Sequence, residues 1–347
     1  MCTSQKYRII DLRRAERGRD RQQSFIYSDK NRDVADVYPF PRYLAQQIPC
    51  RNCWECKVQK AKEWAFRGMK EAKEYEDNIM MTLTYDDEHV QKTTYIDYDT
   101  GEIKEALTLR VKDHQDFMKR LRKHFGKGIK SMIAGEYGSN EEYIDFRGNR
   151  RIATERPHYH IICFNLKVDD LKFFKMKKCE WSSEKNALYT SKTISKIWGM
   201  GDVQLNEVNY ETSAYVARYT TKKLYGDEAV EKYDERGRQV PYLATSRRPG
   251  LGYKFFQEHK QEYIEGKTFY IKSKKGLQEI NKLEYFDKLL EKEDPEAMAK
   301  IKDRRMQQAI ENWKAISEKI DIPKHQYIAN REYANNQKFR KLTRRLG

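Results

Sequence analysis

Residues 158–166 read HYHIICFNL, a run of β-branched and aromatic residues that carries two histidines one position apart. This composition predicts a β-strand. Successive side chains of a strand point to opposite faces, so His158 and His160 share one face, with about 6.5–7 Å between their α-carbons. Two imidazoles placed in this way can bind one metal ion; the alternative is a pair of half-buried polar residues with a structural role.

A second predicted strand, SMIAGEYG at residues 131–138, precedes the first. We expect the two strands to pair as an antiparallel hairpin with a long connection. Glu136 lies in the second strand and provides an oxygen ligand beside His158 and His160 if the register allows it; otherwise it is a carboxylate near a turn. Two imidazoles and a carboxylate suit Mn²⁺ or Mg²⁺, and they also tolerate Zn²⁺ or Ni²⁺.

The sequence on either side of this hairpin predicts the rest of the architecture. A strand is expected at 78–87, and helices are expected at about 57–75, 107–125 and 211–225. The order of these elements predicts an α+β fold, in which helices flank an antiparallel sheet. We divide the chain into a basic N-terminal arm (1–48), a cysteine cluster with a helix (49–76), the sheet domain (77–265) and a charged helical C-terminal extension (266–347), which is interrupted at Pro295.

The composition favours a polyanionic partner. The 347 residues include 69 Lys and Arg against 53 Asp and Glu, a net charge of +16, together with 24 Tyr. Positive charges neutralise phosphates and aromatic rings stack on unpaired bases, which points to nucleic acid, although many basic proteins bind nothing specific. The sequence has no GxxxxGK[ST] phosphate loop, so an ATP-driven motor is disfavoured.

Hydropathy and cysteine content indicate in which cellular compartment the protein is expected to reside. No run approaches the ~18–20 apolar residues of a membrane span, and the N-terminal residues lack the apolar segment of a signal peptide. Six cysteines in 347 residues are too few for a disulfide scaffold. We therefore expect a protein that is not secreted, has no membrane partner and stays in the cytoplasm.

The predicted helix at 211–225 carries Tyr215, Tyr219 and Lys222. Their spacing of i, i+4 and i+7 places two phenols and an ammonium group on one helix face. The face either lines a site or packs its tyrosines into the core.

Three cysteines at CxxCxxC spacing, Cys50, Cys53 and Cys56, lie just before the first helix. Three thiols are one ligand short of a tetrahedral zinc site, and Cys179 or a histidine such as His89 could supply the fourth. Since nothing in the sequence selects a fourth ligand, we expect ordinary reduced cysteines here rather than zinc.

These motifs together resemble the HUH endonucleases that initiate rolling-circle replication, and among them the replication initiators of microviruses, particularly the gokushovirus type. PHYHIICF is similar to their His-hydrophobe-His motif, YVARYTTKK to their paired-tyrosine motif and NIMMTLTYDD to their first, structural motif. IPCRNCWECKVQKAKEWAFR and SRRPGLG (246–252) also look like segments of these initiators, so the likeness spans about 50–255. Two departures are Tyr159 in place of an aliphatic residue and the long loop between Glu136 and His158.

The resemblance implies a fold, a reaction and a substrate. The fold is an HUH/RRM-like palm, and 77–265 is the endonuclease domain. The reaction is metal-dependent cleavage and joining of single-stranded or extruded origin DNA, through a 5′-phosphotyrosine, to initiate and terminate rolling-circle replication of a small phage genome. His158, His160 and Glu136 would hold Mg²⁺ or Mn²⁺, Tyr215 and Tyr219 would attack the phosphate, and Lys222 would stabilise charge.

The resemblance also implies partners. Arg247 and Arg248 are candidates for contacts with the DNA backbone, with a plain surface loop as the alternative. A helicase and a polymerase of the bacterial host are expected partners, in the host cytoplasm. A non-catalytic binder of single-stranded nucleic acid and a metal-dependent hydrolase that uses water remain the rival interpretations.

Overall fold

The computed structural model describes residues 6–11, 24–27, 37, 42–51, 53–138, 142–144, 150–152, 155–178, 185–222, 230–273, 276–280, 282–323 and short stretches between 326 and 337. The chain forms two compact units. One contains residues 1–59 and 299–347, and the other is Lys60–Met298.

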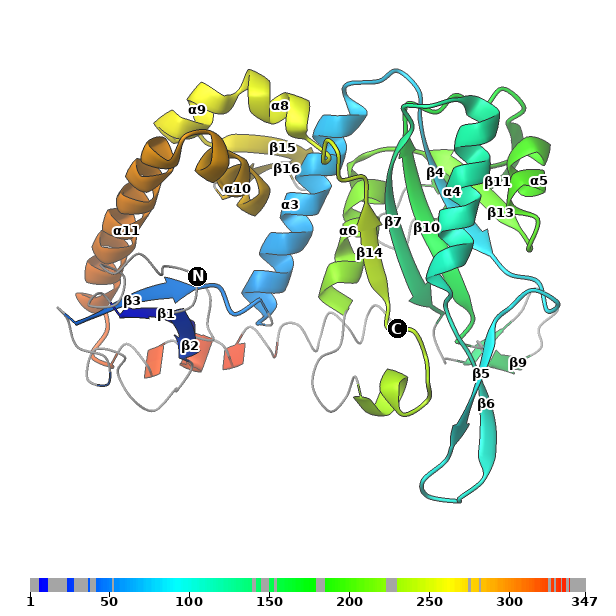
Figure 1. Ribbon diagram of the computed structural model, residues 1–347, viewed down its shortest axis with the longest axis horizontal. Coiled ribbons are helices and arrows are strands. Elements are labelled where there is room, and N and C mark those ends of the chain that lie inside the picture. The colour runs from blue at the N-terminus through cyan, green and yellow to red at the C-terminus, as the bar shows by residue number, and fades with distance from the viewer. Residues whose placement is uncertain are drawn as a thin grey trace. The chain divides into compact units, whose positions relative to one another are not determined.

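A seven-stranded sheet is the centre of the Lys60–Met298 unit (Figure 1). Its strands, in spatial order, are β11 (Lys172–Lys178), β12 (Lys185–Thr190), β13 (Val203–Glu207), β4 (Asn78–Thr84), β10 (Pro157–Phe164), β7 (Lys130–Tyr137) and β14 (Tyr242–Thr245). Every neighbouring pair is antiparallel. The predicted α+β class and the pairing of β7 with β10 are therefore confirmed.

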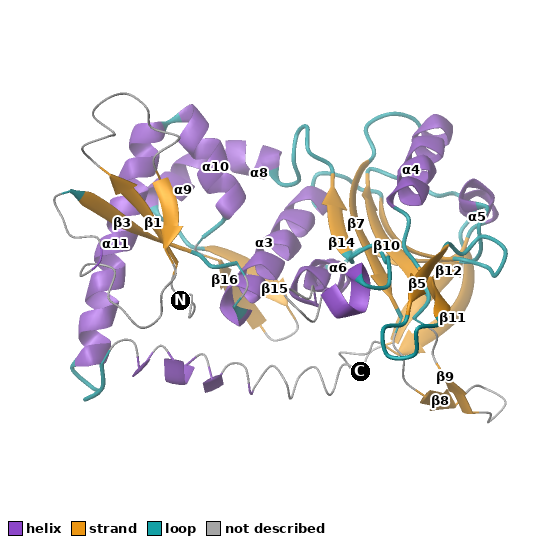
Figure 2. Ribbon diagram, turned by 60° about the horizontal axis from the view of Figure 1, so that its bottom comes forward, coloured by secondary structure: helices purple, strands orange, loops and turns teal. Residues whose placement is uncertain are grey.

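Helices cover both faces of this sheet, as Figure 2 shows. They are α3 (Trp54–Ala72) and α6 (Tyr210–Lys222) on one face, and α4 (Val111–Phe125) and α5 (Lys192–Trp198) on the other. Helix α4 begins later than the predicted residue 107, because 103–107 forms strand β6 (Ile103–Leu107) with β5 (Lys92–Ile96). Arg110 is still extended, and its backbone N–H donates to the hydroxyl of Tyr159.

The alternation along β10 sends its side chains into two separate cores. Tyr159, Ile161 and Cys163 are fully buried on the face covered by α4 and α5. Ile162 and Phe164 are fully buried against α3 and α6. Since side chains alternate along a strand, the two histidines of β10 lie on the α6 face.

The C-terminal part of this unit differs from the expected run of helix. Residues 269–280 form a hairpin of β15 (Phe269–Ser273) and β16 (Gly276–Ile280) between the helices α8 (Tyr253–Glu258), α9 (Lys260–Glu265) and α10 (Glu284–Glu293). Phe269 packs in a cluster of aromatic rings with Phe66, Phe255 and Tyr263. Burial of this aromatic side chain favours a strand over the helix that the surrounding charged sequence indicated.

The other unit contains a three-stranded antiparallel sheet in the order β2 (Ser24–Tyr27), β1 (Lys6–Asp11) and β3 (Tyr43–Ile48). We expected an arm without regular structure here. The strands form because pairing joins segments far apart in sequence and fully buries Ile9, which local patterning does not reveal. The charged helix α11 (Pro295–Ser317) begins at Pro295, where the sequence predicted an interruption.

Strand β11 forms one edge of the seven-stranded sheet. Phe173, Phe174 and Met176 are exposed; Lys175 lies between the last two, and further lysines lie at both ends of the strand. The pairing with β12 is irregular between Phe173 and Lys175, which is a β-bulge. In the described part of the chain, no helix has the length and apolar character needed to cross a membrane.

Candidate active site

The register between β7 and β10 brings the predicted metal ligands together. His158 pairs directly with Glu136, and His160 is two residues further on the same face. The Oε1 atom of Glu136 lies 2.8 Å from Nε2 of His158 and 3.0 Å from Nε2 of His160. Glu136 and His160 are buried, with 7% and 6% of their surface exposed, and His158 is half-buried. The long connection before β10 does not prevent this pairing.

The other nitrogen of each imidazole is also held. Nδ1 of His158 lies 3.2 Å from the backbone oxygen of Arg156, and Nδ1 of His160 lies 3.0 Å from Oγ1 of Thr82 on β4. These contacts fix both ring orientations, so that the two Nε2 atoms face the same carboxylate. Such outer contacts are typical of histidines that bind metal ions.

The donor set fits a divalent cation. The carbonyl oxygen of Arg156 can only accept a hydrogen bond, so the proton of a neutral His158 ring lies on Nδ1 and the lone pair of Nε2 faces Glu136. A lone pair and a carboxylate at this distance repel one another unless a proton or a metal ion lies between them. Two ligand atoms at right angles, each about 2.1 Å from an ion, lie about 3.0 Å apart. The distances of 2.8 and 3.0 Å in this site match that spacing.

The electrostatics of Glu136 favour its charged form. Burial opposes ionisation, but when a proton lies between each Nε2 atom and the carboxylate, the interactions with His158 and His160 outweigh burial and hold the pKa of the carboxyl group well below its usual range. The carboxyl group of Glu136 is therefore ionised at neutral pH.

Helix α6 brings a phenol to the same site. Val216 and Ala217 are fully buried and seat the helix on the sheet face that carries the histidines. The hydroxyl of Tyr215 lies 3.4 Å from Nε2 of His160, and the two rings meet edge to face at 4.9 Å. Tyr219 and Lys222 lie one and two turns further along α6, and their side chains are outside the described residues.

Tyr159 lies between the two histidines in sequence but has a structural role on the other face of the strand. Its fully buried ring points to the opposite face, where the hydroxyl donates to the backbone oxygen of Arg110 at 2.8 Å and lies 2.7 Å from the hydroxyl of Tyr85. The Tyr85 hydroxyl donates in turn to Asp113. Burial raises the pKa of Tyr159 to about 12, so this phenol stays protonated. Tyr159, which stands where the resembling motif has an aliphatic residue, therefore packs and hydrogen-bonds in the core behind the sheet and does not alter the face that carries the histidines.

Arg247 and Arg248 are exposed in the turn that follows β14. The rest of their segment is fixed to α3: Nε of Arg67 donates to the backbone oxygen of Leu251 at 2.9 Å, and Glu71 accepts from the backbone N–H of Gly252 at 2.8 Å. The loop therefore presents two arginines from an anchored support. Their contact with DNA stays a prediction.

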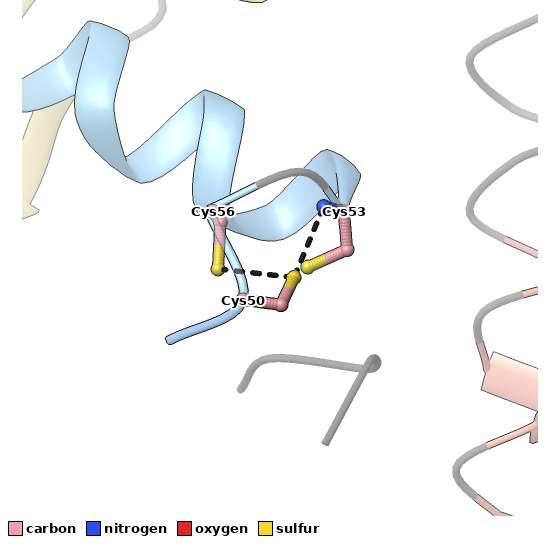
Figure 3. Close-up of side chains that lie close together, drawn as sticks. All are labelled: Cys50, Cys53 and Cys56. Carbon is pink, nitrogen blue, oxygen red and sulfur yellow. Dashed lines mark hydrogen bonds between the residues drawn. The ribbon is translucent and has the colours of Figure 1, made fainter. Parts of the chain in front are cut away.

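The cysteine cluster forms a second group of candidate metal ligands. The sulfur atoms of Cys50, Cys53 and Cys56 lie within 4.8 Å of one another (Figure 3). Among the described residues, no fourth ligand atom joins this group, and His89 instead lies 2.7 Å from Asp86. Cys179 is outside the described residues. Cys163 is a fully buried core residue, and burial raises the pKa of its thiol to about 12.

Sequence reasoning missed the residues that orient the ligands. Thr82 gave no signal of its own, because its role depends on the register in which β4 pairs with His160. The carbonyl group of Arg156 is a backbone feature that side-chain patterns do not show. The network of Tyr85 and Asp113 follows from α4 packing on the sheet, which joins residues distant in sequence.

Comparison with known proteins places these residues in a family context. Residues 78–224 match the family model of the ORF2 type of replication-associated protein. The chain is 33% identical to the replication-associated protein ORF2 of Spiroplasma virus 4 over 79% of this chain and 78% of that protein. It is 31% identical to the replication-associated protein VP4 of Bdellovibrio phage phiMH2K, covering 63% and 61%, and 28% identical to the replication-associated protein ORF4 of Chlamydia phage 1, covering 68% and 52%. No solved structure matches the chain.

Proposed function

Because the chain belongs to the family of ORF2-type replication-associated proteins, we propose that it initiates and terminates rolling-circle replication of a small single-stranded DNA phage. The proposed activity is that of an HUH endonuclease: it cuts single-stranded or extruded origin DNA through a 5′-phosphotyrosine and later joins the ends. The five strands β13, β4, β10, β7 and β14 would be the HUH/RRM-like palm.

One observation carries this proposal: a tyrosine hydroxyl lies beside a carboxylate and two imidazoles. The 3.4 Å between the Tyr215 hydroxyl and Nε2 of His160 brings a nucleophile and a candidate metal site into one place, from segments 55 residues apart. A purely structural use of this face would not require a buried carboxylate between two histidines. The net charge of +16 supports a polyanionic substrate.

The chemistry follows from these groups. A divalent ion held by Glu136, His158 and His160 would act as a Lewis acid toward a phosphate oxygen. The phenolic oxygen of Tyr215 or Tyr219 attacks the phosphorus of the scissile phosphodiester, the bond from phosphorus to the 3′ oxygen breaks, and that oxygen leaves as a 3′-OH after taking up a proton. The phenol loses its own proton in the process. The DNA 5′ end then stays bound as a phosphotyrosine ester, whose energy allows rejoining without ATP.

Two tyrosines on one helix support repeated cleavage. One phenol would hold the first 5′ end while the other cuts the regenerated origin, and the released 3′-OH would attack the first ester to close a circle. Lys222 would stabilise the negative charge of the phenolate or of the transition state. The free 3′-OH would prime a host polymerase, with a host helicase opening the duplex, in the bacterial cytoplasm.

The test is formation of a covalent adduct. The full-length protein is incubated with labelled single-stranded DNA that carries the phage origin, with Mn²⁺ or Mg²⁺, and a species stable in SDS is sought. We expect the adduct with the wild type and with Tyr210→Phe, a tyrosine at the start of the same helix. We expect none with Tyr215→Phe plus Tyr219→Phe, with His160→Ala, or in chelator.

The other outcomes identify the rivals. An adduct in the double tyrosine variant would show that the nucleophiles are wrong. Cleavage by that variant without an adduct would indicate a hydrolase that uses water. Binding that persists in chelator, with neither cleavage nor adduct in any protein, would indicate a non-catalytic binder of single-stranded DNA.

A further inference from the structure

The outer strand β11 carries exposed aromatic rings among lysines, and the proposed cleavage chemistry does not use them. The strand reads KFFKMKK, with four lysines and no acidic residue in seven positions. Phe173 and Phe174 are exposed over 61% and 52% of their surface. Figure 2 shows this strand at the edge of the seven-stranded sheet. Neighbouring apolar rings that stay in contact with water indicate a binding surface.

The β-bulge of β11 distributes its side chains between the two faces of the sheet. Phe173 pairs with Tyr189, whose ring packs on the core under α4 and α5, and the two rings lie 6.2 Å apart. Lys175 pairs with Leu188, the neighbour of Tyr189, on the face that carries the histidines. Phe174 is the extra residue of the bulge, and Nζ of Lys175 lies 4.9 Å from the centre of its ring. Phe174 and Lys175 therefore lie side by side on the histidine face.

A row of paired residues connects the candidate active site with this edge. His160 pairs with Thr82, and Thr82 pairs with Gln204. The pairing of β12 with β13 places Thr190 beside Gln204, and Thr190 pairs with Lys172. Paired residues share a face, so the row extends from β10 to β11 over four strand spacings, about 19–20 Å. Thr82, Gln204 and Thr190 are half-buried, which gives a polar path along the sheet.

Lys172, Phe174 and Lys175 form what we call the edge site, and its chemistry is that of a site for single-stranded nucleic acid. Aromatic rings stack on unpaired bases, and ammonium groups bind the phosphates beside them. Asp170, the last acidic residue before β11, accepts hydrogen bonds at the start of α5 instead. We propose that the edge site binds the single-stranded DNA on one side of the scissile phosphate, with a base stacked on Phe174. This inference rests on the proposed function, because the DNA would reach the edge site from the active site.

A surface of anionic lipid is the other ligand that combines with lysines and aromatic rings. The position of the edge site favours DNA. It shares a face with His160, and polar side chains occupy the path between the two sites. A membrane contact at the edge of the sheet would require neither feature.

The test measures binding in chelator, where no cleavage takes place. The full-length protein is titrated into fluorescent single-stranded oligonucleotides, and the dissociation constant is measured by anisotropy. One short oligonucleotide carries only the nick site of the origin, and two others extend it by several nucleotides on the 5′ side or on the 3′ side. We expect the wild type to bind one of the extended oligonucleotides more tightly than the short one.

Variants of exposed residues identify the edge site. Phe174→Ser should weaken binding of the favoured extended oligonucleotide about 5- to 100-fold, the range for loss of one stacked base. Phe173→Ser is the matched control, because it removes an equally exposed ring on the opposite face, and it should keep the gain from the extension. Lys172→Glu plus Lys175→Glu should reduce the slope of log affinity against log salt by about 1.4, since each phosphate neutralised on a single strand contributes about 0.7. Thermal unfolding of each variant checks that the fold is retained.

The outcomes separate this proposal from the proposed function. Equal affinity of the wild type for all three oligonucleotides, or equal losses in Phe173→Ser and Phe174→Ser, would overturn the edge site. Binding of the wild type to phosphatidylglycerol vesicles that Phe174→Ser removes, with unchanged affinity for DNA, would assign the edge to a membrane instead. The proposed function is judged by the covalent adduct of the wild type with the short oligonucleotide and Mn²⁺. No adduct, together with a gain from the extension that depends on Phe174, would retain the edge site and reject the nuclease.

Discussion

Mutations on the two faces of β10 should have different effects, one on stability and the other on DNA cleavage. Tyr159→Phe is the most direct test of this expectation. The change removes one hydroxyl group from a fully buried side chain. That hydroxyl donates to the backbone oxygen of Arg110 at 2.8 Å, accepts from its backbone N–H at 3.2 Å and lies 2.7 Å from the hydroxyl of Tyr85. Buried hydrogen bonds contribute about 0.5–1.5 kcal/mol each, so we expect a loss of about 2–4 kcal/mol in the free energy of unfolding.

The assay compares Tyr159→Phe with His158→Ala by denaturant unfolding and by the DNA adduct assay. For a unit of this size, a loss of about 2–4 kcal/mol lowers the melting temperature by roughly 5–15 °C. Tyr159→Phe should keep adduct formation at temperatures where it is folded, since its hydroxyl faces away from Glu136. His158→Ala should lose the adduct even at temperatures where the protein is folded, because it removes one of the candidate metal ligands. An unchanged unfolding midpoint for Tyr159→Phe, or loss of the adduct in folded Tyr159→Phe protein, would refute this division of roles.

Three further results are expected. Burial lowers the pKa of His114 to about 4. The contribution of His114 to the unfolding free energy should therefore be constant above pH 6.5 and should fall by up to about 3 kcal/mol as the pH drops toward 4, because only the unfolded state then takes up the proton. His114→Gln should reduce this dependence of stability on pH, and an equal slope in both proteins would exclude His114 as the cause. Gly201 has φ of 139°, and in Gly201→Ala the new Cβ atom would clash with the backbone oxygen of Thr84, so the unfolding free energy should fall by at least about 2 kcal/mol in a denaturant titration. Gly101→Ala is the control: Gly101 has open space around it, and its substitution should lower the unfolding free energy by only about 1 kcal/mol. Similar losses in the two variants would argue against the clash. Mn²⁺ at about 100 times its dissociation constant should raise the stability by about 2.7 kcal/mol, and Glu136→Gln should remove most of this gain in a thermal scan; full retention would exclude Glu136 as a ligand.

The sequence predicted the strands that carry the candidate site better than it predicted how those strands pair. Both strands of the histidine hairpin were predicted, because runs of β-branched and aromatic residues mark strands locally. Their register was not predicted, because the pairing of Glu136 with His158 depends on contacts across the 19-residue connection from 138 to 156. The same limit hid Thr82, whose position beside His160 comes from a third strand.

Other elements could not be predicted for related reasons. Strand β11 reads KFFKMKK, in which lysines and exposed aromatic residues do not alternate in the way that a half-buried strand requires. Strand β15 lies in charged sequence and depends on the packing of Phe269 against rings from three helices.

The lysines and the bulge of β11 have a consequence for how the protein behaves at high concentration. An outer strand has unpaired backbone groups that can recruit a strand of another copy, and exposed Phe173 and Phe174 would strengthen such an association. The charge of Lys175, whose ammonium group lies 4.9 Å from the ring of Phe174, and the irregular pairing beside it both oppose stacking of one copy on the next. A chain that exchanged these lysines for threonines would keep the fold of each molecule and would be prone to aggregate during overproduction.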